Sequence, residues 1–206
     1  MFDLPIRKIV HSTKAWKGPG RMSQSLYFPD AVPTLSGDML YLRELTEDDV
    51  PAWFERASDL ESAVLAGDPI PESVEVGFEW LQRHRERFRQ QAGIRWAIVE
   101  KGSTHSVGTI GLAITSKEKR IAELGIVIGR AYWGKGIGTS AAHLVTGYAF
   151  GTLGLAEIRA EALQRNLASR RLLEKAGFRL LRTIPGDPHS ETDFEDCFLF
   201  VLSSRG

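Results

Sequence analysis

Hydrophobic and polar positions alternate with a period of two in several short stretches of the chain, and with a period near 3.6 in others. The first regular stretch, 39–45, alternates like a strand, and Thr46 with Asp49 three positions later marks a helix start, with the helix running to about Ala57. The stretch 59–73 contains the residues of a loop. A longer helix is predicted from Pro71 to about Gln91, with an apolar stripe that would cover one face of a sheet.

Strand-like segments dominate the second half of the chain. The turns between the first three are too short for a crossover helix, so an antiparallel meander is expected. A glycine-rich turn then leads into a helix and another strand, which is typical of a βαβ unit, and Asn166 is placed to cap a further helix that ends at Gly177. These strand candidates are 94–100, 106–115, 120–129, 156–163, 178–184 and 194–202.

Composition separates a short N-terminal segment from the rest. Residues 1–35 carry five basic residues against two acidic ones and four prolines, which predicts an irregular extension before one domain at 36–206. Over the whole chain Lys+Arg 26 balance Asp+Glu 26, so no global field favours nucleic acid or an anionic membrane. The single cysteine, Cys197, and the lack of metal-ligand spacing predict no structural metal. No run is apolar enough for a membrane span or secretory signal, so a cytoplasmic protein is expected.

The turn at 133–139 reads Trp-Gly-Lys-Gly-Ile-Gly-Thr. Its glycines let backbone N–H groups approach a ligand at a helix N-terminus, so an anion such as pyrophosphate is the expected guest; a tightly packed turn without a ligand is the alternative. A triphosphatase loop does not fit, because Gly136 stands where that motif needs a hydroxyl. The glycine spacing also fits a dinucleotide-binding motif, and Glu161 follows at the distance along the chain expected for the residue that contacts the ribose. That motif usually opens a parallel sheet, however, whereas several strands precede it here.

The run AELGIVIGRAYWGKGIGTSA at 122–141, followed by NLASRRLLEKAGF at 166–178, resembles the GNAT superfamily of N-acetyltransferases, and within it the Rim-type branch. The resemblance covers roughly 37–203. It implies an α/β (α+β) fold with a mixed, mostly antiparallel sheet flanked by helices, and acetyl-CoA as the cosubstrate. The strand before the turn would splay from its neighbour and hold the pantetheine arm. The residues so assigned to acetyl-CoA are Leu124, Ile126, Val127, Ile128, Trp133, Gly134, Lys135, Gly136, Ile137, Gly138, Thr139 and Asn166.

Transfer of an acetyl group to an amine needs a base, because the amine is normally cationic near neutrality. Glu123, on the strand before the turn, is the candidate base, because GNAT enzymes that this chain resembles often carry a Glu there. Many members carry a Tyr seven residues after the Asn, but this chain has Leu173 there, so the usual acid is missing. Ser169 is the remaining candidate for protonating or holding the thiol sulfur, and solvent is the other source of the proton. Both Glu123 and Ser169 also have ordinary structural interpretations.

Acidic residues concentrate at 187–196 and in the loop that holds Asp59, Glu61 and Asp68, two regions that border the acceptor site in the family. A cationic amine acceptor is therefore expected. The arginines at alternate positions of 83–89 are interpreted as a solvated helix face. A non-catalytic acyl-CoA sensor remains the alternative function, a nucleic-acid-binding protein is disfavoured, and a homodimer is left open.

Overall fold

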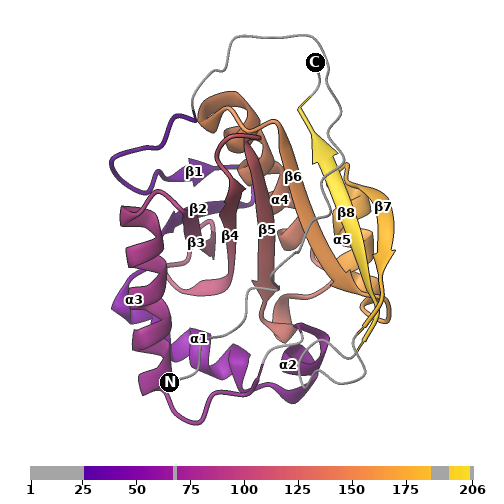
Figure 1. Ribbon diagram of the computed structural model, residues 1–206. Helices are drawn as coiled ribbons and strands as arrows, with labels where there is room; N and C mark the ends of the chain where they lie inside the picture. Colours follow the sequence, from indigo (N-terminus) through magenta and orange to yellow (C-terminus); the bar gives the residue numbers. More distant parts are fainter. Residues whose placement is uncertain (1–25, 67–68, 187–194, 205–206) are drawn as a thin grey trace, which may run out of the picture.

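The computed structural model describes residues 26–66, 69–186 and 195–204. Its strands form one eight-stranded sheet in the order β1-β2-β3-β4-β5-β6-β8-β7 (Figure 1). Every pairing is antiparallel except that of β5 with β6. The strands are β1 Leu35–Ser36, β2 Leu40–Glu44, β3 Gly93–Glu100, β4 Ser106–Ser116, β5 Ile121–Ile128, β6 Glu157–Leu163, β7 Arg179–Ile184 and β8 Cys197–Ser203.

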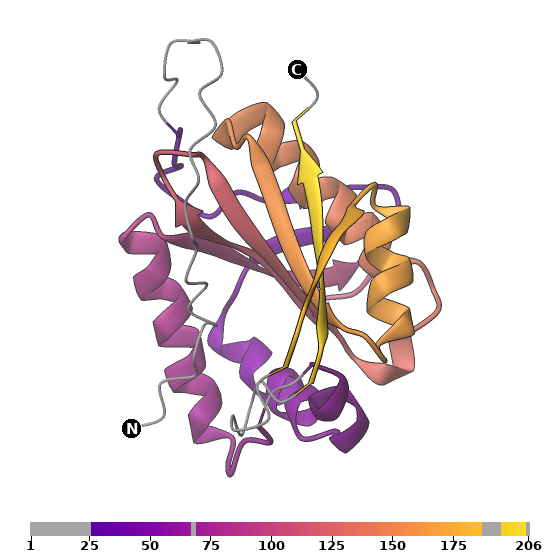
Figure 2. The ribbon, with the colours of Figure 1, turned by 45° about the vertical axis from the view of Figure 1, so that its right-hand side comes forward.

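Helices cover both faces of this sheet, as Figure 2 shows. The first three helices lie together on one face, with α1 against α3 and α3 against β3, and α4 and α5 lie on the other. The α-helices are α1 Val50–Ala57, α2 Leu60–Ala66, α3 Glu75–Arg89, α4 Ile137–Tyr148 and α5 Leu167–Lys175, and single turns occur at Glu47–Asp49, Arg130–Tyr132 and Ala149–Leu153.

Strand β3 shows how the sequence divides the core between the two faces. Trp96 and Ile98 are fully buried in the larger cluster beneath α4, whereas Ala97 and Val99 belong to a smaller cluster with Leu81 of α3. Successive strand residues point to opposite faces, so the sequence of a strand that is covered on both sides is a continuous apolar run. The same alternation on β5 buries Ala122 and Leu124 in the larger cluster.

The predicted strands, the β3-β4-β5 meander and the β5-α4-β6 unit are confirmed. So is the helix start at Thr46, whose backbone N–H donates to the Asp49 carboxylate at 2.9 Å in a capping box. The loop expected at 59–73 is partly wrong, because Leu60–Ala66 form α2. The Asp59 carboxylate accepts bonds from the Ser62 backbone N–H and hydroxyl, which satisfies the start of that helix.

Two further boundaries concern the ends of predicted segments. Helix α3 begins at Glu75, not at Pro71, after a bend at residues 72–73. Of the N-terminal segment, 1–25 lies outside the described residues. Residues 26–35 pack on the core, where the Trp96 indole N–H donates to the Pro33 carbonyl at 2.8 Å. The domain boundary at 36 stays a prediction.

Candidate active site

The central opening of the sheet lies between β5 and β6. The two strands pair only where Ile121–Glu123 lie beside Glu157–Arg159. Beyond Glu123, β5 continues beside β4 as far as Ile128 without pairing to β6. The expected splay is therefore present, and one edge of Leu124–Ile128 offers backbone N–H and C=O groups that no neighbouring strand takes up.

A cavity of about 400 Å³ occupies this opening. It brings together six of the residues predicted from the sequence, namely Glu123, Leu124, Ile126, Val127, Asn166 and Ser169. Its walls come from β3, β4, β5 and β6, from the start of β8, from α3 and from the facing ends of α2 and α5. The remaining lining residues are Leu65, Ala66, His84, Arg87, Ile94, Arg95, Gly111, Leu112, Ala113, Gly125, Ala160, Glu161, Ala162, Leu163, Leu173, Glu195 and Cys197.

Glu123 is half-buried where β5 and β6 part. Burial raises the pKa of its carboxyl group, and the nearby Glu161 carboxylate raises it further, while the positive charge of Arg87 acts in the opposite direction. A carboxylate with a raised pKa binds a proton more tightly than an ordinary glutamate and is better matched to taking one from an amine near neutral pH. Geometry and electrostatics thus allow Glu123 to act as a general base.

Asn166 has a structural role whatever else it does. Its side-chain oxygen accepts from the Ser169 backbone N–H at 3.0 Å, and its amide nitrogen donates to the Leu65 carbonyl at 2.9 Å. It therefore caps α5, as expected, and also ties α5 to the end of α2. Ser169 is half-buried at the cavity wall, and Leu173, one turn later, is buried and lines the same cavity. The position of the missing Tyr thus offers no hydroxyl.

The glycine-rich turn does not line the cavity but follows the end of β5. Gly134 and Gly136 have φ of +75° and +78°, a conformation that favours glycine, and open space lies beyond their α-carbons. Gly136 is the N-cap of α4, and the Trp133 indole N–H donates to the Ile128 carbonyl at 2.7 Å. An anion held here would meet the N–H groups of the first turn of α4.

Other residues of the turn serve packing. A β-carbon on Gly138 would lie 2.3 Å from Leu172 Cδ1, so this glycine lets α4 approach α5. Ile137 is buried in the core, and the Lys135 ammonium lies 5.1 Å from the centre of the Tyr132 ring. Packing therefore accounts for Gly138 and Ile137. Their assignment to acetyl-CoA, with those of Lys135 and Thr139, stays a prediction.

Three polar side chains of the cavity were not predicted as site residues from the sequence, namely His84, Arg87 and Arg95, and Glu161 was considered only as a ribose contact. Arg87 was placed on a solvated face, yet it is half-buried and lines the cavity. Burial and the charges of Arg95, Arg87 and Arg83 hold the pKa of His84 far below its usual range, so its imidazole is neutral. Of these residues, only Arg95 stands out in the sequence, because it is a charged residue inside an apolar strand.

The acidic residues expected to border the acceptor are only partly described. Asp68 and 187–194 lie outside the described residues. Asp59 and Glu61 lie 3.7 Å and 2.7 Å from the guanidinium nitrogens of Arg130, so one positive charge partly compensates the two carboxylates. Within the described ranges, no group of three or more His, Cys, Asp or Glu side chains could hold a metal ion. In the same part of the chain, no helix is long and apolar enough to cross a membrane.

A family model described as an acetyltransferase (GNAT) domain matches residues 39–179, more than half of the chain. The chain belongs to the GNAT family of acetyltransferases. The matched range contains the splayed strand, the cavity carboxylates of Glu123 and Glu161, and the glycine-rich turn. The uncharacterized N-acetyltransferase YoaA of Bacillus subtilis is 34% identical over 147 residues, which cover 71% of this chain and 83% of YoaA. The chain is therefore an N-acetyltransferase by family.

Solved GNAT structures share the fold. RimJ of Mycobacterium smegmatis, in complex with CoA-disulfide, aligns with a TM-score of 0.74 at 21% identity, covering 86% of this chain and 90% of RimJ. Spermidine N-acetyltransferase of Vibrio cholerae, in complex with CoA and spermine, aligns with a TM-score of 0.69 at 19% identity, covering 80% and 95%. The sheet and helix arrangement expected from the GNAT resemblance is thus confirmed, and the Rim-type branch stays a prediction.

Proposed function

We propose that this enzyme transfers the acetyl group of acetyl-CoA to a primary amine by direct attack. The observation that carries the proposal is the edge of β5, which leaves β6 at Glu123 and continues to the glycine-rich turn. In the reaction the amine nitrogen bonds to the acetyl carbon as the carbon–sulfur bond breaks. The arriving ammonium group gives its first proton to Glu123, and the second proton that the nitrogen loses as the amide forms passes to the departing thiolate through Ser169 or solvent.

The chain offers two surfaces for acetyl-CoA. The backbone edge at Leu124, Ile126, Val127 and Ile128 suits the amide groups of the pantetheine arm, because it pairs with β4 on one side and with no strand on the other. The turn from Trp133 to Thr139 suits the pyrophosphate, because Gly134 and Gly136 leave open space before the first turn of α4. With these two parts bound, the thioester would present its activated acetyl group to the cavity.

Two side chains are assigned to proton handling. Glu123 acts as the base, supported by its place in the cavity and its raised pKa. Ser169 is assigned to the thiol, supported by its place on the cavity wall two residues beyond the start of α5. The amine arrives as an ammonium ion, and the carboxylates of Glu123 and Glu161 provide the negative charge that attracts it. A homodimer stays a prediction.

Replacing the base tests this proposal. Glu123→Gln should lower kcat/KM for an amine acceptor by 10² to 10⁴, the usual contribution of a general base, and should leave acetyl-CoA binding unchanged. Part of the loss should be recovered as the pH rises, because more of the amine is then neutral in solution. Glu174→Gln, on the exposed face of α5, is the matched control.

The outcomes distinguish acetyl transfer from the alternative, a non-catalytic acyl-CoA sensor. An unchanged rate in Glu123→Gln would remove this residue from the mechanism. If the unaltered protein binds acetyl-CoA but releases no CoA with broad panels of primary amines, the non-catalytic acyl-CoA sensor is the better account.

A further inference from the structure

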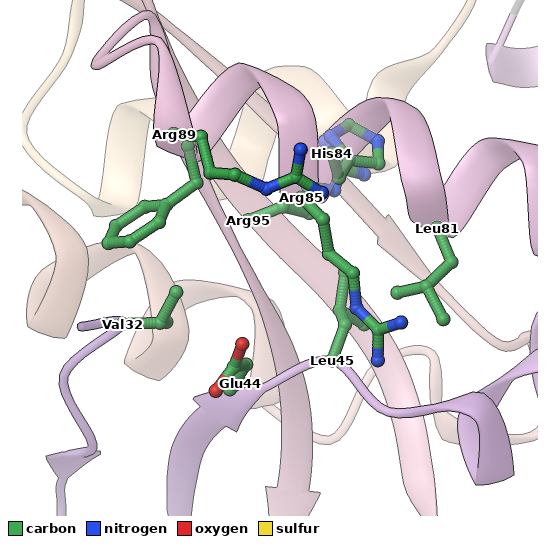
Figure 3. A pocket seen from close by; sticks show the side chains of 9 residues that line it. Val32, Glu44, Leu45, Leu81, His84, Arg85, Arg89 and Arg95 are labelled. Atoms are coloured by element: carbon green, nitrogen blue, oxygen red, sulfur yellow. The ribbon is translucent and has the colours of Figure 1, made fainter.

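One arginine of the protein is buried away from the site described above. Figure 3 shows Arg85, Arg89 and Arg95 beside a cavity of about 200 Å³. Arg85 and Arg89 pair with glutamates at the surface, so surface ion pairs account for them. Among the described arginines only Arg56, at the end of α1, is buried, with 9% of its surface exposed.

Arg56 joins the end of α1 to the place where β4 begins and β5 ends. Its Nη1 donates to the Ser106 carbonyl at 3.0 Å, and the next carbonyl, that of Val107, accepts from the Gly129 N–H at 2.9 Å. A β-carbon on Gly129 would lie 3.2 Å from Arg56 Cδ, closer than two carbon atoms normally approach. The φ of Gly129 is −57°, an ordinary value. The glycine therefore serves the close approach of Arg56 and not a special backbone conformation.

From Gly129 a short series of hydrogen bonds leads to the glycine-rich turn. The Tyr132 N–H donates to the Gly129 carbonyl at 2.9 Å, and the Trp133 N–H donates to the Arg130 carbonyl at 3.1 Å. The Trp133 indole N–H returns to the Ile128 carbonyl at 2.7 Å. The two glycines with positive φ follow directly. A displacement of Gly129 would therefore reach the backbone N–H groups that are proposed to meet the pyrophosphate.

Arg56 also brings a positive charge to this end of β5. Burial lowers the pKa of its guanidinium to about 10, at which it stays cationic near neutrality, and the carboxylates of Asp49 and Glu55 act in the opposite direction. Asp49 accepts two bonds from Arg43, at 2.7 Å and 2.9 Å, so its single charge is shared between two guanidinium groups. Glu55 is exposed, and solvent screens its charge. A net positive charge remains at Arg56.

Stability alone is a poor explanation for this arginine. Among the described residues its Nη2 has no hydrogen-bond partner, although that atom is buried. A buried donor without a partner is costly, and apolar side chains often replace buried ionic groups without loss of stability. The arginine is therefore expected to serve something other than the fold.

We propose that Arg56 is a positioning residue for acetyl-CoA, which holds the backbone at the start of the turn and favours the pyrophosphate through its buried charge. The inference rests on the proposed acetyl-CoA site and adds to it a residue that the ligand does not touch. Because the charge is buried, salt screens it less than it screens the exposed Lys135 of the same turn.

Two ligands that share the thioester but differ in phosphate test this role. Acetyl-CoA contains the pyrophosphate, whereas S-acetylpantetheine ends before it. Arg56→Met should raise the Kd of acetyl-CoA about tenfold and change that of S-acetylpantetheine less than about threefold. Arg56→Lys keeps the charge and should recover most of the loss. Displacement calorimetry measures both ligands on the folded variants.

Arg43→Met is the matched control, because it removes a guanidinium from the same Asp49 carboxylate and Arg43 bonds no residue of the turn. It should lower the melting temperature and keep the ratio of the two Kd values within about twofold. If Arg56 served stability alone, Arg56→Met would behave in the same way.

Gly129→Ala tests the contact from its other side and carries the test where Arg56→Met does not fold. Its methyl group presses on the Arg56 side chain, which should raise the Kd of acetyl-CoA about fivefold relative to that of S-acetylpantetheine. Gly147→Ala, whose methyl group meets nothing within 4 Å, should leave the ratio unchanged.

The results distinguish this inference from the function beneath it. An unchanged ratio in Arg56→Met or in Gly129→Ala, or an equal change of ratio in Arg43→Met, would overturn the role of Arg56 while the acetyl-CoA site stood. Absence of acetyl-CoA binding by the unaltered, folded protein would overturn both.

Discussion

The same substitution at two positions of α4 should change stability in opposite directions. Gly136 is the N-cap of α4 and has φ of +78°, whereas Gly147 lies within that helix near its end, exposed and without positive φ. An added β-carbon meets nothing within 4 Å at either position. The difference between the two variants therefore isolates the backbone conformation from any steric clash.

The magnitudes follow from backbone conformation alone. Gly136→Ala places an L-residue in the left-handed region, which costs about 1–2 kcal/mol. Gly147→Ala removes backbone freedom from the unfolded chain at a helical position, which stabilises by about 0.5–1 kcal/mol. At roughly 2–4 °C per kcal/mol for a chain of this size, Gly136→Ala should melt about 2–8 °C lower and Gly147→Ala about 1–4 °C higher than the unaltered protein.

Urea unfolding followed by tryptophan fluorescence, together with thermal melts, measures both changes. Gly136→Ala should also weaken acetyl-CoA binding, because its methyl group enters the space assigned to the pyrophosphate, and Gly147→Ala should not. Equal shifts of the same sign in the two variants would refute the reasoning, since the positive φ of Gly136 would then have no energetic consequence.

Two further changes test the charges described above. Glu161→Gln removes the second cause of the raised Glu123 pKa, so that pKa falls and the acidic limb of the kcat/KM profile moves to lower pH; an unmoved limb would uncouple the two carboxylates. Asp49 is buried, which opposes its charged form, yet bonds from Arg43 at 2.7 Å and 2.9 Å and from Thr46 lower its pKa overall. Asp49→Asn should therefore cost about 1.5–3 kcal/mol at neutral pH. A carboxyl group whose pKa is lowered by folding stabilises the folded state at pH values above its unfolded pKa, and this contribution is lost as the pH falls through the folded pKa. The loss of unfolding free energy in Asp49→Asn should therefore become smaller below the ordinary pKa of 3.8. A loss measured by urea unfolding that stayed constant with pH would contradict this.

Local signals were sufficient for most of the fold. Strand alternation, the Thr46 capping box and the Asn166 cap act within a few residues, so their outcome is visible in the sequence. Helix α2 was missed because its signal, the Asp59 bonds to Ser62, looks like loop composition until the geometry is known. The late start of α3 shows that a proline permits a helix to begin without fixing where it does.

The site divides in the same way. Glu123, Ser169 and Asn166 could be placed in one cavity because motif residues of the βαβ unit and the next helix converge at the splay. Arg87 could not, because helix α3 comes to face the opening only through packing between distant segments. The role of Gly138 also depends on a distant contact, that of α4 with Leu172 of α5. Long-range packing, invisible to periodicity, thus separates the predicted residues from the missed ones.

The splayed strand and the glycine-rich turn are proposed to form one acetyl-CoA site. Calorimetric titration of the purified protein with acetyl-CoA, with ATP and NAD as controls, tests it before any acceptor is known. Acetyl-CoA should bind with a dissociation constant in the micromolar range, ATP and NAD should not, and Gly136→Glu should abolish binding while the variant stays folded. A folded protein that binds no acetyl-CoA, or a Gly136→Glu variant that binds it unchanged, would contradict the account.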